Sequence, residues 1–331
     1  MNPLVHGPLA PLFDDPRVTE ILVNGPDAVY AEVGGRLQRA DLRFRDDVEL
    51  RQTVVRLVGL CGRRIDDATP LVDARLPDGS RLNAVLPPLA VDGPLLTVRR
   101  FGVRRLTIDD LLRLGSLTEE QAAAVRAIVD ARLNVVVSGG TSSGKTTLLA
   151  AMVGLVDPAE RVVSVEDAAE LALPIPHVAR LEARPANVEG RGAIDVRALV
   201  RNALRMRPDR LVVGEVRDAS VTDLLAALNT GHEGGCGTIH ANSAVDVAAR
   251  VEALALAAGW GRAATHSQLA SAIDAVVHVA RADGRRVVRE VAVPLRSPDG
   301  WVSLEPAVEF LDDGSTRCGP AADRLDRRLA R

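Results

Sequence analysis

The segment from Asn134 to Leu149, NVVVSGGTSSGKTTLL, carries the most specific chemical pattern in this chain of 331 residues. It holds G-x-x-x-x-G-K-[ST] between a short apolar run and a helix-compatible stretch, the order of a phosphate-binding loop. Backbone N–H groups of such a loop face phosphate oxygens, Lys145 reaches the β- and γ-phosphates, and the Thr146 hydroxyl ligates Mg²⁺. Lys145 is the only lysine in the chain, and all other Lys or Arg positions hold Arg. This position therefore keeps a compact ammonium in place of a broad guanidinium, as a phosphate-binding loop requires. The predicted nucleotide contacts in this loop are Gly139, Gly140, Thr141, Ser142, Ser143, Gly144, Lys145, Thr146 and Thr147.

A first group of acids follows the next apolar run, in the segment RVVSVEDAAEL. Ligands of an open α/β sheet bind at the carboxyl ends of its strands, so Glu166 is placed to orient or deprotonate a water that attacks the γ-phosphate. The alternative is a strand-to-helix junction in which Glu166, Asp167 and Glu170 stabilise the start of a helix. The residues alone favour this alternative.

A second group is LVVGE, an apolar strand that ends at Glu215. The pattern resembles a Walker B strand with Glu in place of the more usual Asp. A carboxylate at this place holds Mg²⁺ through water, because Mg²⁺ keeps much of its hydration shell. A buried acid without a cation would be costly. We therefore predict a Mg²⁺ site formed by Thr146 and Glu215.

A third group is the glycine-rich segment GHEGGCGTIHANS, in which His240 ends a strand at the predicted ligand edge. His240 can hydrogen-bond a γ-phosphate oxygen and report its presence. His232 and His240 lack the spacing of zinc ligands, and no cysteine pair accompanies them. The remaining histidines that we considered, including His266 and His278, read as ordinary core or capping residues.

The elements that must position these residues alternate between strand and helix from Asn134 onward, which predicts a parallel sheet covered on both faces. We expect strands at 134–138, 162–166, 178–182, 211–214 and 236–239, and helices at 195–206 and 219–229. This is the pattern of an α/β domain. Further strand-like runs follow residue 274.

Upstream, short strand-like runs separated by turn residues predict a small α+β domain, with a hairpin across Gly34-Gly35 and one helix capped by Asp46 or Asp47. We expect five parts: a loosely held N-terminus at 1–17, the small domain at 18–101, a linker at 102–117, the ATPase domain at 118–294, and C-terminal strands with a loosely held tail at 295–331. The proline-rich start and the charged end are the reasons for the two loose termini.

Composition limits the classes of function. The formal net charge is −3 and aromatic residues make up 2% of the chain, which offers nucleic acid neither a strong field nor stacking platforms. The three cysteines lack metal or redox spacing and are expected to be reduced thiols. No apolar run approaches the length of a membrane span, and no signal peptide is recognised.

The order SGGTSSGKTT, VEDAAEL, RMRPDRLVVGEVR and TGHEGGCGTIHANS resembles the type II/type IV secretion ATPase superfamily, most of all its tight-adherence (Flp) pilus assembly ATPases. The upstream segment LPDGSRLNAVLPPLAVDGPLLTVRRF is also similar to the family's N-terminal domain. The resemblance spans roughly residues 18–294 and rests on four motifs in order. It implies a RecA-like α/β domain with Mg²⁺-dependent ATPase activity and a hexameric ring, peripheral to the inner face of the cytoplasmic membrane, with integral membrane platform proteins as partners.

The resemblance also implies roles for single residues. Glu166 would position the attacking water, which reverses the interpretation from the residues alone. Glu215 would be the Walker B acid, and His240 the γ-phosphate sensor. Arg217 resembles a family arginine that follows the Walker B strand. Arginines of the N-terminal domain that reach the nucleotide would match Arg81 and either Arg99 or Arg100, whose guanidinium groups can spread phosphoryl charge.

The resulting hypothesis is an ATPase motor that couples hydrolysis to domain motion in pilus assembly or protein secretion. The main alternative is a RecA-like nucleic-acid translocase, which charge and aromatic content disfavour. A guanine-specifying N-K-x-D motif is impossible because the only lysine belongs to the phosphate-binding loop, which weakens a GTPase interpretation. A nucleotide-binding subunit without turnover is a further alternative, and a turnover assay would separate it.

Overall fold

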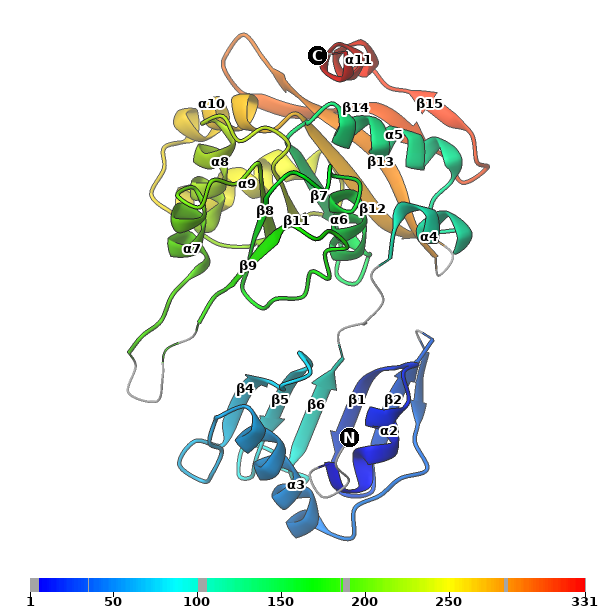
Figure 1. The fold of residues 1–331 in the computed structure, drawn as a ribbon, viewed down its shortest axis with the longest axis vertical. Coiled ribbons are helices and arrows are strands. Elements are labelled where there is room, and N and C mark those ends of the chain that lie inside the picture. The colour runs from blue at the N-terminus through cyan, green and yellow to red at the C-terminus, as the bar shows by residue number, and fades with distance from the viewer. Residues whose placement is uncertain are drawn as a thin grey trace. The chain divides into compact units, whose positions relative to one another are not determined.

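The computed structural model describes residues 6–34, 36–100, 106–184, 186, 191–282 and 285–330. It divides into two compact units, Met1–Val103 and Arg104–Arg331, each with its own sheet and core (Figure 1). Gly35 of the predicted hairpin and residues 102–105 of the predicted linker lie outside the described residues. We describe each unit by itself.

The first unit is a six-stranded antiparallel sheet in the order β3-β2-β1-β6-β5-β4. Helix α3 begins after Asp46, whose side chain accepts from the Glu49 N–H at 2.8 Å, as predicted. Its buried positions pack with the strands to form the core of this unit. The elements are η1 (Gly7–Leu9), α2 (Ala10–Asp14), β1 (Val18–Asn24), β2 (Val29–Val33), β3 (Arg36–Arg39), α3 (Asp47–Leu60), β4 (Leu71–Arg75), β5 (Arg81–Val85) and β6 (Leu95–Arg99).

The N-terminal segment differs from the expectation of a loosely held stretch over residues 1–17. Residues 7–14 form two short helical elements, η1 and α2, and Leu9 and Phe13 belong to the core at 0% and 1% exposure. The prolines that suggested disorder occupy the first turn of each element, where a missing N–H breaks no helical hydrogen bond. Proline therefore starts these helices.

The second unit is built on a nine-stranded sheet in the order β15-β14-β13-β12-β7-β11-β10-β8-β9. The parallel part of the sheet comprises β12, β7, β11, β10, β8 and β9, and β13, β14 and β15 extend it in antiparallel fashion. The five strands predicted after residue 133 are all present. The elements are α4 (Ile108–Arg113), α5 (Glu119–Asp130), β7 (Val135–Gly139), α6 (Lys145–Val153), β8 (Val162–Glu166), β9 (Val178–Glu182), α7 (Val196–Ala203), β10 (Arg210–Val216), α8 (Ser220–Leu228), β11 (Cys236–His240), α9 (Asp246–Ala257), α10 (Arg262–Ala272), β12 (Ala275–Ala282), β13 (Arg285–Arg296), β14 (Val302–Phe310), β15 (Thr316–Cys318) and α11 (Ala322–Leu329).

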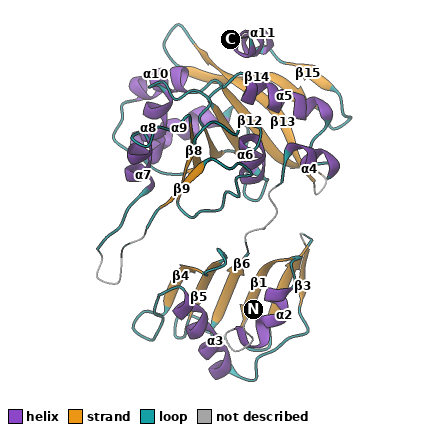
Figure 2. Cartoon of the chain, in the orientation of Figure 1, coloured by secondary structure: helices purple, strands orange, loops and turns teal. Residues whose placement is uncertain are grey.

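Helices cover both faces of this sheet (Figure 2). One core contains side chains of α4, α5, α6 and α11, and the other contains side chains of α7, α8, α9 and α10. Strands β7 and β8 are buried along their whole length, which explains why their sequences are continuous apolar runs. The predicted α/β fold class is confirmed.

The C-terminal part also differs from the sequence-based expectation. The expected boundary at 294/295 falls inside β13, so the last strands continue the sheet of the second unit. The tail is helix α11, which buries Leu325, and Arg328 donates to the Ile273 carbonyl at 3.2 Å and pairs with Asp274 at 3.0 Å. Charged residues around a few leucines look like a solvated tail in sequence, but their helical spacing places Leu325 and Arg328 on the protein.

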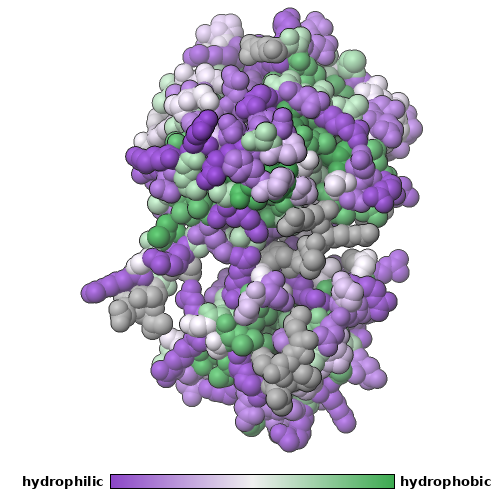
Figure 3. Space-filling model, viewed as in Figure 1, coloured by the Kyte–Doolittle hydropathy of each residue, from purple (hydrophilic) through white to green (hydrophobic). Residues whose placement is uncertain are grey.

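No helix within the described ranges is long and apolar enough to cross a membrane. The face drawn in Figure 3 is mostly polar, with hydrophobic side chains gathered in limited areas on both units. Exposed apolar side chains such as Leu89 and Leu114 are normal on a protein surface.

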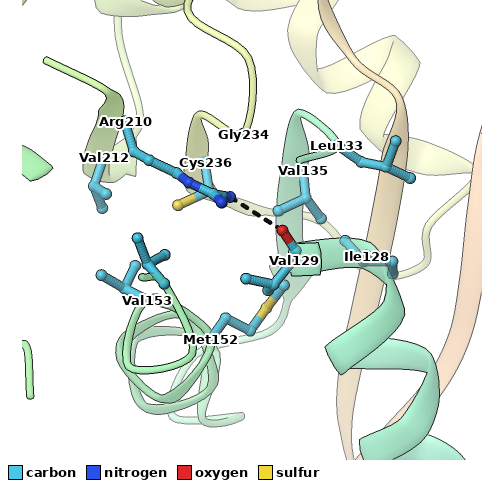
Figure 4. Close-up of a pocket in the computed structure, with 11 residues that line it drawn as sticks. Ile128, Val129, Leu133, Val135, Met152, Val153, Arg210, Val212, Gly234 and Cys236 are labelled. Atoms are coloured by element: carbon cyan, nitrogen blue, oxygen red, sulfur yellow. Dashed lines mark hydrogen bonds between the residues drawn. The ribbon is translucent and has the colours of Figure 1, made fainter. Parts of the chain in front are cut away.

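A small apolar cavity lies at the amino-terminal edge of the second sheet, where Val135, Arg210 and Cys236 begin their strands (Figure 4). The buried Arg210 guanidinium donates to the Val129 carbonyl at 3.3 Å and to both Glu160 carboxylate oxygens. The phosphate-binding loop follows the other end of β7. This cavity therefore belongs to the core and is separate from the predicted nucleotide site.

The three cysteines should differ sharply in reactivity. Burial raises the pKa of the Cys236 thiol to about 12, and it raises the pKa of Cys61 as well, whereas Cys318 is exposed. A thiolate is the reacting form, so a disulfide reagent near pH 8 should label Cys318 first, Cys61 slowly, and Cys236 only after unfolding. Mass spectrometry of a labelling time course checks this order. Labelling of native Cys236 as fast as Cys318 would contradict it.

Candidate functional site

The phosphate-binding loop joins β7 to α6 and requires glycine at both of its ends. At Gly139, a Cβ atom would lie 2.3 Å from the Val279 carbonyl oxygen of the neighbouring strand β12. At Gly144, φ is +99°, in the left-handed region that glycine enters without strain, and α6 begins at the next residue. The loop thus places the helix N-terminus at the carboxyl edge of the parallel sheet.

The Lys145 ammonium is folded back over this loop. Its Nζ donates to the carbonyls of Gly139 at 2.9 Å and Gly140 at 2.7 Å, and the side chain is nearly buried. Burial lowers the pKa of Lys145, while the Glu215 carboxylate acts in the opposite direction. The two carbonyls hold the charge at a place from which it can move to a phosphate oxygen.

His240 and Glu215 converge on the same ammonium from the ends of β11 and β10. Lys145 Nζ lies 3.3 Å from His240 Nε2, and that nitrogen lies 3.8 Å from a Glu215 carboxylate oxygen. Burial, and then the nearby Lys145, lower the pKa of His240, so the imidazole is neutral near pH 7. Three residues that lie far apart in sequence are thus brought together at one edge of the sheet.

Glu166, at the end of β8, is 3% exposed, and its two carboxylate oxygens have different surroundings. Oε2 accepts from the Glu170 and Leu171 N–H groups, both at 2.7 Å, while Oε1 is buried without a hydrogen-bond partner. Burial raises the pKa of Glu166, against the lowering effect of these N–H groups and of Arg180. One oxygen is anchored and the other is available to a ligand or water.

The alternative role of Glu166 as a helix cap is wrong, because residues 167–177 form no helix. The chain after β8 turns back instead, and its N–H groups bind the carboxylate. Room for Glu166 comes from Gly214, where a Cβ would lie 2.7 Å from Glu166 Cγ. The Gly214 carbonyl accepts from the buried Thr238 hydroxyl at 2.6 Å, which ties β10 to β11.

Arg217 follows β10 and forms an ion pair with Asp167, which follows β8. This pair joins the two acidic segments across the edge of the sheet. The contact is partly exposed, so we expect the ion pair to add little to the stability of the fold.

The site also fits a phosphate and a hydrated cation. The Ser143 hydroxyl in the loop is 3% exposed and lacks a hydrogen-bond partner, as a group awaiting an acceptor would. Thr146 lies in the first turn of α6 and is partly accessible. No group of three or more His, Cys, Asp or Glu side chains that could hold a metal occurs in the part of the chain that the structure describes. Mg²⁺ would therefore rely on Thr146, Glu215, phosphate oxygens and water, as it commonly does.

The N-terminal arginines separate into two kinds. Arg99 pairs with Glu20 at 3.3 Å, stands opposite Arg81 in the sheet register, and is half exposed. Arg100 NH1 instead donates to the carbonyls of Leu12, Asp15 and Val18, the closest at 2.6 Å. Arg100 is therefore committed to holding the turn between α2 and β1, and of the two neighbours Arg99 is the better candidate for a nucleotide contact.

Sequence reasoning missed two residues that support the site. Arg286 of β13 donates from Nε to the Ser142 carbonyl at 3.2 Å, and its stem fills the space beside Gly144. Arg180 of β9 lies 3.9 Å from Glu166 Oε1. Both lie on strands outside the recognised motifs, and no local pattern marks them.

The fold and the loop geometry define a phosphate-loop ATPase unit with an α+β N-terminal unit. Comparison with known proteins gives the family: residues 4–305 match the Type II/IV secretion system protein family, and the chain belongs to it. This confirms the family resemblance noted in the sequence.

A putative conjugal transfer protein of Mycobacterium tuberculosis is 53% identical over 303 residues, which cover 89% of this chain and 86% of that protein. The probable conjugal transfer protein TrbB of Sinorhizobium fredii is 33% identical over 297 residues, 88% of each chain. Among solved structures, the ATPase DotB of Legionella pneumophila aligns over 92% of this chain and 80% of its own with a TM-score of 0.58 at 20% identity, which supports the fold.

Substitution of the two neighbouring arginines should lower stability by different amounts. Replacing Arg100 by Ala leaves three backbone carbonyls without their donor and should cost about 2–4 kcal/mol of unfolding free energy. Replacing Arg99 by Ala removes a partly exposed ion pair and should cost at most about 1 kcal/mol. Urea unfolding of the full chain measures both, and equal losses for the two variants would contradict the assignment of Arg100.

Proposed function

We propose that this protein is a Mg²⁺-dependent ATPase motor, assembled as a homo-hexameric ring on the cytoplasmic side of the cytoplasmic membrane. The observation that carries this proposal is the convergence of Lys145, Glu215 and His240 on one edge of the sheet. Lys145 Nζ lies 3.3 Å from His240 Nε2, and that nitrogen lies 3.8 Å from a Glu215 carboxylate oxygen. Membership of the Type II/IV secretion system protein family supports it. The work would be pilus assembly or secretion through integral membrane platform proteins.

In this mechanism, Lys145 exchanges the carbonyls of Gly139 and Gly140 for oxygens of the β- and γ-phosphates. Glu166 keeps Oε2 on its two N–H donors and uses Oε1 to accept a hydrogen bond, and then the proton, from the attacking water. The raised pKa makes Glu166 a stronger base than an exposed carboxylate. Neutral His240 can donate to the γ-phosphate and thereby sense it. Mg²⁺, held by Thr146 and Glu215, would neutralise phosphate charge.

Arg81 and Arg99 belong to this proposal as nucleotide contacts supplied from the N-terminal unit of the same or a neighbouring subunit. They stand opposite each other on adjacent strands, which places two guanidinium groups on one face of the sheet. Arg99 pairs with Glu20 at 3.3 Å, and in this proposal phosphate oxygens replace that partner when nucleotide binds. Hydrolysis would then be coupled to movement of the N-terminal unit.

Replacing Glu166 by Gln should remove the base while keeping the acceptor oxygen that the two N–H groups need. We expect kcat for ATP to fall at least about 100-fold, with little change in affinity for a fluorescent ATP analogue. Glu170→Gln is the matched control, because it keeps the backbone N–H that bonds Glu166 and removes a carboxylate whose charge has only a minor effect on the pKa of Glu166. A wild-type rate in Glu166→Gln would exclude Glu166 as the base, and absence of turnover in the wild-type protein would overturn the proposed function.

The ring and its arginines are tested together. With a non-hydrolysable ATP analogue, mass photometry should show a hexamer of 35.1-kDa chains. Arg99→Ala should keep this assembly and lower kcat, whereas Arg36→Ala, on the edge strand β3 of the same sheet, should change neither. A persistent monomer, or wild-type turnover in both Arg81→Ala and Arg99→Ala, would contradict this part of the proposal.

Two relatives are described as conjugal transfer proteins, which favours a second candidate, a motor that moves nucleic acid. The near-neutral charge and low aromatic content count against it. The same ATPase assay decides between them: single-stranded DNA should stimulate turnover of a translocase and leave a secretion or pilus motor unchanged.

A further inference from the structure

A buried polar group lies beneath the phosphate-binding loop, on the face of the sheet that α9 covers. Ser138, the residue before Gly139, and His278 of β12 are neighbours in register, and Ser138 Oγ lies 2.9 Å from His278 Nδ1. Ser138 is 0% and His278 is 5% exposed. Polar groups in an apolar core are costly unless their hydrogen bonds are satisfied, so the presence of both side chains at this place calls for a reason.

The ring of His278 also interacts with the segment that follows His240. Burial lowers the pKa of His278, and a hydrogen bond of the ring to the Asn242 backbone acts in the opposite direction. A backbone group that favours the charged form is an acceptor. Because Nδ1 lies beside the Ser138 hydroxyl, a neutral ring that accepts there would donate to Asn242 from Nε2. One tautomer satisfies both partners.

A third contact holds the same segment from the next strand. Glu290 of β13 stands opposite His278 in register, and its Oε1 accepts from the Ala244 N–H at 3.0 Å. The residues after His240 are therefore attached at two points to side chains of β12 and β13, and His278 is in turn attached to the strand that carries the phosphate-binding loop.

We propose that His278 and Glu290 are positioning residues, which fix the segment 241–245 and through it hold His240 against Lys145. The inference rests on the proposed function only in giving His240 a γ-phosphate to contact. His240 Nε2 lies 3.3 Å from Lys145 Nζ. The ladder of β11 with β7 holds the His240 backbone from one side, and the segment after it would hold it from the other. Small displacements of a group that contacts the reacting phosphate lower kcat more than they lower binding.

The two nitrogens of His278 can be separated by amide substitutions. His278→Gln places an N–H near the position of Nε2 and should keep the Asn242 contact, whereas His278→Asn reaches only the position of Nδ1 and should lose it. We expect kcat to fall about 10-fold or more in His278→Asn with KM for ATP within about twofold, and His278→Gln to recover most of the loss. Glu290→Ala should behave like His278→Asn, and Glu290→Gln, which retains an acceptor, should behave like wild type.

Hydrogen exchange tests the positioning without any turnover. In the nucleotide-free protein, peptides that cover 241–246 should exchange at least about 10-fold faster in His278→Asn and Glu290→Ala than in wild type. The matched control is His266→Gln, because His266 is also buried, at 4% exposure, but bonds Glu252 and the Val302 N–H.

The outcomes are distinct. Faster exchange confined to 241–246 supports the inference even if the wild-type protein proves not to hydrolyse ATP, a result that would overturn only the proposed function. Unchanged exchange of this segment in His278→Asn and Glu290→Ala overturns the inference. Faster exchange spread equally over β7, β12 and β13 also overturns it, because His278 would then serve only the stability of the fold.

Discussion

The second unit depends on one buried ammonium. Lys145 is 7% exposed, and a cation at this depth is tolerated only because carbonyls and an acid surround it. Those acceptors exist because the loop winds back over the helix N-terminus, and the loop can do so only where Gly139 passes close to β12. The parallel order of the strands then brings the ends of β10 and β11 to the same place. The Lys145 charge, the conformation of the phosphate-binding loop and the parallel strand order therefore depend on one another.

Around this ammonium, the acids are kept in different environments. Glu166 is buried with a raised pKa and one oxygen that has no hydrogen bond, while Glu215 is 40% exposed and close to both Lys145 and His240. Environment thus separates a carboxylate suited to proton transfer from one suited to a hydrated cation, although both residues are glutamates at the ends of neighbouring strands.

Sequence predicted the parts of the site that are encoded locally. The phosphate-binding loop, the apolar strand ending at Glu215 and the position of His240 follow from short patterns, and the resulting fold class is confirmed. Glu166 was ambiguous from its residues, because the same acids suit a helix start, and only the return of the chain over its carboxylate removes that alternative. His278 was interpreted as a core residue since its partner Ser138 lies 140 residues away, and register is set by the whole sheet. Arg100 looked equivalent to Arg99 until the fold placed three carbonyls around it.

Gly214 shows how an inactive site could arise without loss of any reacting group. The carboxylate of Glu166 occupies the volume that any larger residue at this position would fill, since a Cβ would come within 2.7 Å of its Cγ. The position of the Glu166 carboxylate therefore depends on the absence of a side chain at Gly214 on the neighbouring strand. A search for functional residues that considers only chemically active side chains would pass over this glycine. With Glu166 as the proposed base, a single added methyl group here would impair hydrolysis while every motif residue stayed in place.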